Sequence, residues 1–172
     1  MNQPADRFEA DRVARRDRLL GWGLACPLTM PGIDLARDIE FTGSPGGRDL
    51  AVVRGPDNLG QALSVAFTTL RESDVFNTAF GFDGLNALAE PAEPVLARER
   101  VRIGVITVLD RDPRVHRIVD VNLDDGRLDP EGPADDATRE ALRHARTLAV
   151  NVQFETVVGD VLAVDLGALP NV

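Results

Sequence analysis

In the C-terminal third of the chain, apolar and polar residues alternate over residues 115–123 and 148–155, and this period of two predicts half-buried β-strands. The first segment ends at the turn signal Asp124-Asp125-Gly126, and Gly159-Asp160 makes the turn into a last apolar segment over residues 161–166. Three such segments joined in chain order predict a three-stranded antiparallel meander. The residues expected to share one side of the first two strands are Val115, Arg117, Val119, Val121 and Leu123, then Leu148, Val150, Val152 and Phe154.

An amphipathic helix is predicted before these strands, because six apolar residues recur at helical spacing. Asp57 or Asn58 is placed to cap its N-terminus, and Gln61 stands three residues after Asn58 as in a capping box. The apolar face consists of Leu59, Ala62, Leu63, Ala66, Phe67 and Leu70.

A second helix is predicted to begin near Pro94 and to end before Pro113, since proline is tolerated in a first turn and disfavours helix just before itself. Residues 101–109 are rich in β-branched side chains, so a strand is the alternative there. The connection over residues 71–91 holds three phenylalanines and is expected to join the core. The predicted fold class is α+β, with two helices packed on a three-stranded antiparallel meander.

The N-terminal region is expected to differ from the rest. Residues 5–20 are charged and helix-permissive, whereas glycine and proline punctuate residues 21–56 without a clear period. The predicted organisation is an N-terminal helix with an irregular arm over residues 1–54, followed by one globular unit over 55–172. Within that unit, residues 124–145 form an acidic insert that we expect at the periphery.

Charge and composition narrow the classes of partner. The net charge is −9, and all 19 basic residues are arginine, so no clustered positive surface for nucleic acid is expected. No apolar run approaches the length of a membrane span, and no leader segment is recognisable, so we expect a cytoplasmic protein without a membrane partner. A single cysteine, Cys26, can form no internal disulfide.

No residue set has the spacing of a known catalytic or cofactor site, so no catalytic residue, metal or cofactor is expected. His116 and His144 lie 28 positions apart, and no phosphate-binding glycine loop or nucleophile elbow occurs. Calcium binding to the acidic insert is the alternative to a solvated loop, although the ligand order of an EF-hand is not met. The residues concerned are Asp124, Asp125, Asp129, Glu131, Asp135 and Asp136.

Four short stretches in order resemble the gpW-like baseplate-wedge family, the sheath initiators of contractile phage tails, type VI secretion systems and contractile injection systems. Residues 55–63 are similar to the family's entry to its first helix, and residues 77–83 to its Phe-Gly connection. Asp112-Pro113-Arg114 stands where the family carries a Glu-Pro-Arg corner, and residues 148–152 resemble a strand of its meander. The resemblance covers about residues 52–167.

The resemblance implies a structural protein with no cofactor, present in six copies, that joins baseplate wedge proteins to the tube and hub and starts the sheath. The implied partner-binding residues are the corner Asp112, Pro113 and Arg114. The last strand, which can accept a partner strand at its edge, contributes Val161, Leu162, Ala163, Val164, Asp165 and Leu166.

Three alternatives stay open. Arg114 can instead form an internal salt bridge with Asp110 or Asp112. The tail over residues 167–172 can instead fold back over the sheet edge. A small acidic hydrolase of the lysozyme kind is the alternative function.

Overall fold

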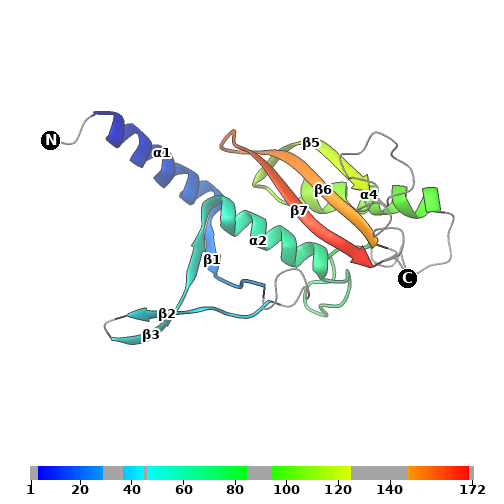
Figure 1. Ribbon diagram of the computed structural model, residues 1–172, viewed down its shortest axis with the longest axis horizontal. Coiled ribbons are helices and arrows are strands. Elements are labelled where there is room, and N and C mark those ends of the chain that lie inside the picture. Colours follow the sequence, from blue (N-terminus) through cyan, green and yellow to red (C-terminus); the bar gives the residue numbers. More distant parts are fainter. Residues whose placement is uncertain (1–3, 29–36, 45, 85–93, 125–146, 171–172) are drawn as a thin grey trace, which may run out of the picture. The chain divides into compact units, whose positions relative to one another are not determined.

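The computed structural model describes residues 4–28, 37–44, 46–84, 94–124 and 147–170. The chain is α+β, and its named strands pair antiparallel (Figure 1). It divides into two compact units, Met1–Leu63 and Ser64–Val172. The division falls inside a helix, nine residues after the boundary expected at residues 54 and 55. The acidic insert lies almost entirely outside the described residues, so its peripheral position stays a prediction.

The first unit begins with helix α1, Pro4–Leu20, as the charged segment predicts. The expectation of an irregular arm after it is wrong. Strand β1 (Trp22–Leu24) pairs with β4 (Val52–Arg54), and β2 (Phe41–Ser44) pairs with β3 (Gly47–Leu50) in a hairpin (Figure 1). These strands have three or four residues each, which is too short for a period of two to be recognised in the sequence.

Helix α2, Gly55–Thr68, has the predicted apolar face. Leu59, Leu63, Ala66 and Phe67 are buried, whereas Leu70 lies beyond the helix and is 41% exposed. The helix begins at Gly55, whose φ of 61° is readily adopted only by glycine. Because this start precedes the expected cap, Asn58 and Gln61 do not form a capping box.

Phenylalanine packing anchors the end of the connection after α2, so the prediction that this connection joins the core is right for Phe82, which is buried, and wrong for Val75 and Phe76, which are exposed. The rings of Phe67 and Phe82 meet edge to face, with centroids 5.5 Å apart. Gly81 has a φ of 102°, and a Cβ there would come within 2.7 Å of the Thr69 carbonyl oxygen. Glycine at this position therefore lets the connection return against the end of α2.

Helix α4, Pro94–Arg111, confirms the continuous helix and excludes the strand alternative for residues 101–109. Val101, Val105 and Leu109 are fully buried at a spacing of four, which puts them on one face. Arg98 donates a hydrogen bond to the Leu123 carbonyl, and Arg102 donates one to the Val121 carbonyl at 3.3 Å. These bonds hold α4 along the neighbouring strand.

The second unit contains strands β5 (Val115–Asp124), β6 (Thr147–Thr156) and β7 (Val161–Pro170), hydrogen-bonded in that order (Figure 1). This sheet has the predicted meander order, but it is one of three sheets in the described residues rather than the only one. Its buried side chains are Val121, Leu123, Val150, Val152 and Phe154.

Two details of the predicted strands are wrong. Register shifts interrupt β5, and the one between Ile118 and Asp120 leaves Val119 47% exposed instead of on the inner face. An extra residue at such a bulge reverses the alternation, which the sequence does not reveal. Strand β7 also continues to Pro170, opposite Thr147, so residues 167–170 extend the strand and do not fold back over its edge.

Candidate partner-binding sites

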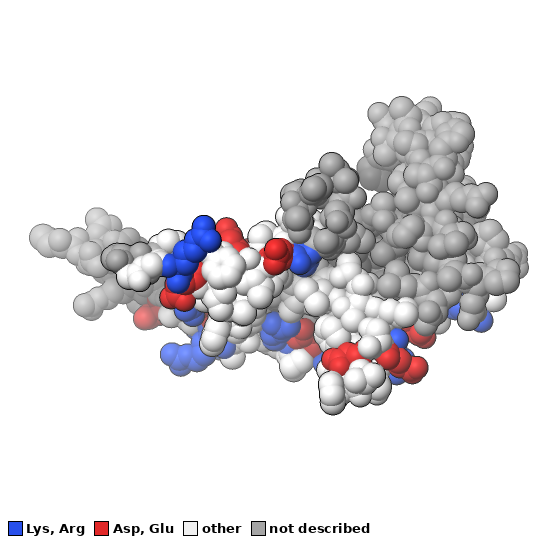
Figure 2. All heavy atoms as spheres, turned by 90° about the horizontal axis from the view of Figure 1, so that it is seen from below, with Lys and Arg blue, Asp and Glu red and all other residues white. Residues whose placement is uncertain are grey.

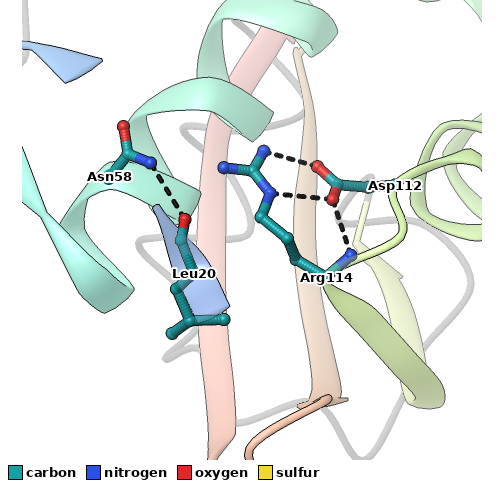
Figure 3. Close-up of polar contacts among 4 residues, drawn as sticks. All are labelled: Leu20, Asn58, Asp112 and Arg114. Carbon is teal, nitrogen blue, oxygen red and sulfur yellow. Dashed lines mark hydrogen bonds and ion pairs between the residues drawn. The ribbon is translucent and has the colours of Figure 1, made fainter. Parts of the chain in front are cut away.

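The corner Asp112-Pro113-Arg114 joins the end of α4 to the start of β5. The Asp112 carboxylate accepts hydrogen bonds from the Arg114 backbone N–H at 3.0 Å, from Nε at 2.8 Å and from Nη2 at 2.6 Å (Figure 3). The backbone bond is an Asx turn, and the two side-chain bonds form a bidentate ion pair. The side chains are only 14% and 24% exposed, so the internal salt bridge foreseen as the alternative for Arg114 is present, with Asp112 as its partner.

The charge of this corner is stabilised by its partner. Burial raises the pKa of Asp112. The side-chain hydrogen bonds, the backbone N–H and the positive charge of Arg114 lower this pKa, and together they outweigh the effect of burial. The net pKa lies below the ordinary value of 3.8. Asp112 therefore stays ionised, and its ion pair fixes the direction of the Arg114 side chain.

The corner is also tied to the turn between β6 and β7. The Val157 N–H donates to the Arg114 carbonyl at 3.0 Å. Val161, the first residue of β7, follows four positions later. The structure therefore brings the two sequence-predicted sites, the corner and the last strand, to the two sides of one turn.

Strand β7 is the edge of its sheet, since it pairs with β6 alone within the described part of the chain. The Thr156 N–H donates to the Asp160 carbonyl at 2.9 Å, which makes these two residues a hydrogen-bonded pair. Such pairs alternate along an antiparallel ladder. With Phe154 opposite Leu162 and Val152 opposite Val164, the backbones of Leu162 and Val164 face β6.

The backbones of Val161, Ala163 and Asp165 consequently face outward. Ala163 is exposed, and it stands opposite Gln153, which is exposed as well. The outer edge of β7 therefore presents peptide N–H and carbonyl groups from residues whose replacement does not disturb the buried face. This alternation is the geometry required to pair with an incoming strand.

Sequence reasoning missed the amide contacts within the first unit. Gln61 donates from Nε2 to the Leu24 carbonyl at 2.8 Å, and its Oε1 accepts from the Cys26 N–H at 2.7 Å. Asn58, which is 7% exposed, donates from Nδ2 to the Leu20 carbonyl at 3.0 Å (Figure 3). The two amides hold the chain before and after β1, and the Asn-x-x-Gln spacing that suggested a capping box was the signal for them.

Other kinds of site find no support in the described residues. His, Cys, Asp and Glu form no group there that could hold a metal ion, and no described helix is long and apolar enough to cross a membrane. On the face shown in Figure 2, basic and acidic side chains are interspersed over the described residues and form no continuous basic surface.

No protein-family model matches this chain, and no curated protein does. The resemblance to baseplate-wedge proteins therefore rests on the quoted stretches and their order alone.

Proposed function

We propose that this chain is a structural baseplate component of a contractile injection system or phage tail, and that it starts sheath assembly. The observation that carries the proposal is the outer edge of β7, where the backbones of Val161, Ala163 and Asp165 face away from β6. An edge of this kind is a template for another strand. Backbone bonds supply affinity without a matched side-chain surface, which suits a protein that begins a repeating lattice.

The order of elements supports the same assignment. Helix α2, the phenylalanine connection, helix α4, the Asp-Pro-Arg corner and a three-stranded sheet follow each other as the resemblance implies. We further propose that the C-terminal turns of α2 and the whole of α4 pack on this sheet as the two helices of the wedge fold.

In this proposal the corner binds a wedge protein. The ion pair to Asp112 orients Arg114, whose side chain is 24% exposed and has the planar fork that pairs with carboxylates and carbonyls. Six copies would surround the tube, joining wedge proteins to the hub, with assembly in the cytoplasm. No cofactor and no enzymatic step is part of this role.

Proline at position 163 tests the edge. Ala163→Pro removes an outward N–H, and its ring obstructs an incoming strand, whereas the bonds to β6 stay intact. The expected particle has a baseplate and a bare tube, seen by electron microscopy of particles from the native gene cluster. Ala163→Val is the matched control, since it keeps the N–H and changes only an exposed side chain.

Circular dichroism and thermal melting of the isolated variants separate lost pairing from misfolding. Val164→Pro removes a donor that faces β6, so it should lower the melting temperature where Ala163→Pro does not. Full-length sheath on particles that carry a folded Ala163→Pro chain would show that this edge is not the joining surface.

A further inference from the structure

The connection between α2 and α4 exposes two apolar side chains in succession. Phe76 is 97% exposed and Val75 is 78% exposed, the two highest values among the large apolar residues that the structure describes. Exposed aromatic surface is unfavourable in water, and it is most useful where a partner buries it. A single exposed apolar residue is ordinary on a protein surface, so the backbone contacts that hold these two residues are needed to argue for a binding role.

Hydrogen bonds hold the backbone before and after Val75 and Phe76. The Phe76 N–H donates to Asp74 Oδ1 at 2.9 Å, and the Asn77 N–H donates to the Asp74 carbonyl at 3.1 Å. The Phe80 N–H then donates to the Asn77 carbonyl at 3.0 Å, and Arg111 of α4 donates from Nη1 to the Ala79 carbonyl at 3.0 Å. The loop therefore presents Val75 and Phe76 in a fixed backbone conformation, which lowers the entropy lost on binding.

The charged residues next to these two in the loop are acidic, while Arg111 of α4 is engaged with the Ala79 carbonyl three residues beyond Phe76. Glu72 and Asp74 are exposed within four positions of Phe76, while the nearest basic residue in sequence, Arg71, is half-buried. Carboxylates beside an apolar tip disfavour an anionic lipid surface, and they disfavour a second copy of the same tip through like-charge repulsion. They favour a protein surface on which basic side chains surround an apolar recess.

We infer that Val75 and Phe76 are an anchor that inserts into an apolar pocket, rimmed by Lys or Arg, on a different protein. Phe76 fills the pocket, Asp74 holds the backbone of the anchor, and Glu72 faces the basic rim. This inference does not depend on the proposed baseplate function, because it uses neither β7 nor the corner.

A photoreactive benzoylphenylalanine at position 76 tests the anchor in cells that make the full chain from its own locus. The side chain remains aromatic, so the pocket should still accept it. The expected result is one cross-linked polypeptide, joined through a peptide that contains apolar residues flanked by Lys or Arg. The same probe at Val157, which is exposed in the turn after β6, is the matched control and should not label that peptide.

A charge reversal at Glu72 and the dependence of cross-linking on salt test whether basic residues surround the pocket. Glu72→Arg in the same background should lower the cross-linking yield several-fold, and raising NaCl in extracts should lower it progressively. With the identified protein, Phe76→Ser should weaken binding at least about tenfold without changing the melting temperature.

Four outcomes would overturn the inference. These are a cross-link within the chain or to a second copy, a cross-link to lipid, the absence of a defined product, and a protein cross-link that neither Glu72→Arg nor salt affects.

Discussion

A single carboxylate holds the corner between α4 and β5 together. Asp112 accepts one backbone and two side-chain hydrogen bonds from Arg114, and Pro113 fixes the backbone between them. In the baseplate-wedge family that we propose for this chain, a glutamate is expected at this place. The shorter aspartate reaches the N–H two residues later, which is the geometry of an Asx turn.

The stability contributed by this corner should depend on pH. Because the pKa of Asp112 is lowered in the folded chain, its contribution is complete above the ordinary pKa of 3.8 and is lost as pH falls through the folded value. Asp112→Asn should therefore be less stable than the parent by a constant amount above about pH 5, and the difference should shrink below about pH 4. Urea unfolding between pH 2.5 and 7 measures this, and a difference that does not vary with pH would contradict the assignment.

Removing the guanidinium separates the two roles of Arg114. If it binds a wedge protein, Arg114→Ala should abolish wedge assembly while the isolated chain keeps its fold. The ion pair is partly exposed, so the loss of unfolding free energy should be no more than about 1 to 3 kcal/mol. Assembly that persists beside a clear loss of stability would assign Arg114 to the internal salt bridge alone.

Gln61 should stabilise the first unit through its two hydrogen bonds. Gln61→Ala should cost about 1 to 2 kcal/mol in unfolding free energy, since the Cys26 N–H and the Leu24 carbonyl both lose a partner. Gln61→Glu keeps the acceptor but puts a carboxylate against the Leu24 carbonyl, so it should be destabilising at pH 7 and recover at acid pH. Gln153→Ala, at an exposed position of β6, is the matched control. Equal losses of stability for Gln61→Ala and Gln153→Ala would show that the two hydrogen bonds of Gln61 do not stabilise the fold.

At the scale of elements, long periodic segments were predictable and short ones were not. Helix α2 repeats its apolar residues at helical spacing, strand β6 alternates them, and Pro94 and Pro113 delimit α4; the structure confirms all three elements. Strands β1 to β4 are fixed by backbone pairing and by side chains distant in sequence, such as Gln61, so no local pattern announces them. The bulge at Val119 is set by pairing with β6, which a single strand does not encode.

The candidate site divides in the same way. The corner and β7 were foreseeable from a turn motif and an apolar run, but the direction of each β7 backbone group required the register. The exposure of Phe76 was not foreseeable, because phenylalanines at positions 67, 76, 80 and 82 look alike in the sequence and only the fold separates the buried from the exposed.

Shortening the acidic insert tests its expected peripheral place. Replacing residues 126–142 with a short Gly-Ser turn should leave the fold intact and change stability by less than about 1 kcal/mol, since loop closure depends weakly on length. Thermal melting measures this. A drop of more than about 10 °C in the melting temperature would show that part of the insert belongs to the core.

At the scale of the whole molecule, the baseplate proposal predicts a defined stoichiometry. Particles purified from the native gene cluster should contain six copies of this chain, and deletion of its gene should leave no assembled sheath. Quantitative mass spectrometry and electron microscopy measure the two. A turbidity assay on cell-wall substrate addresses the hydrolase alternative, and clearing by the purified chain would contradict the structural role.

The outward backbone of β7 also favours self-association of the free protein. An edge recognised through peptide groups does not distinguish a partner's strand from the same strand of another copy. We therefore expect two copies to pair antiparallel along their β7 edges when the chain is made in excess over its partners. Making the chain together with its partners should limit this self-association. Ala163→Pro, which removes the outward N–H, should raise the concentration at which the purified chain stays monomeric.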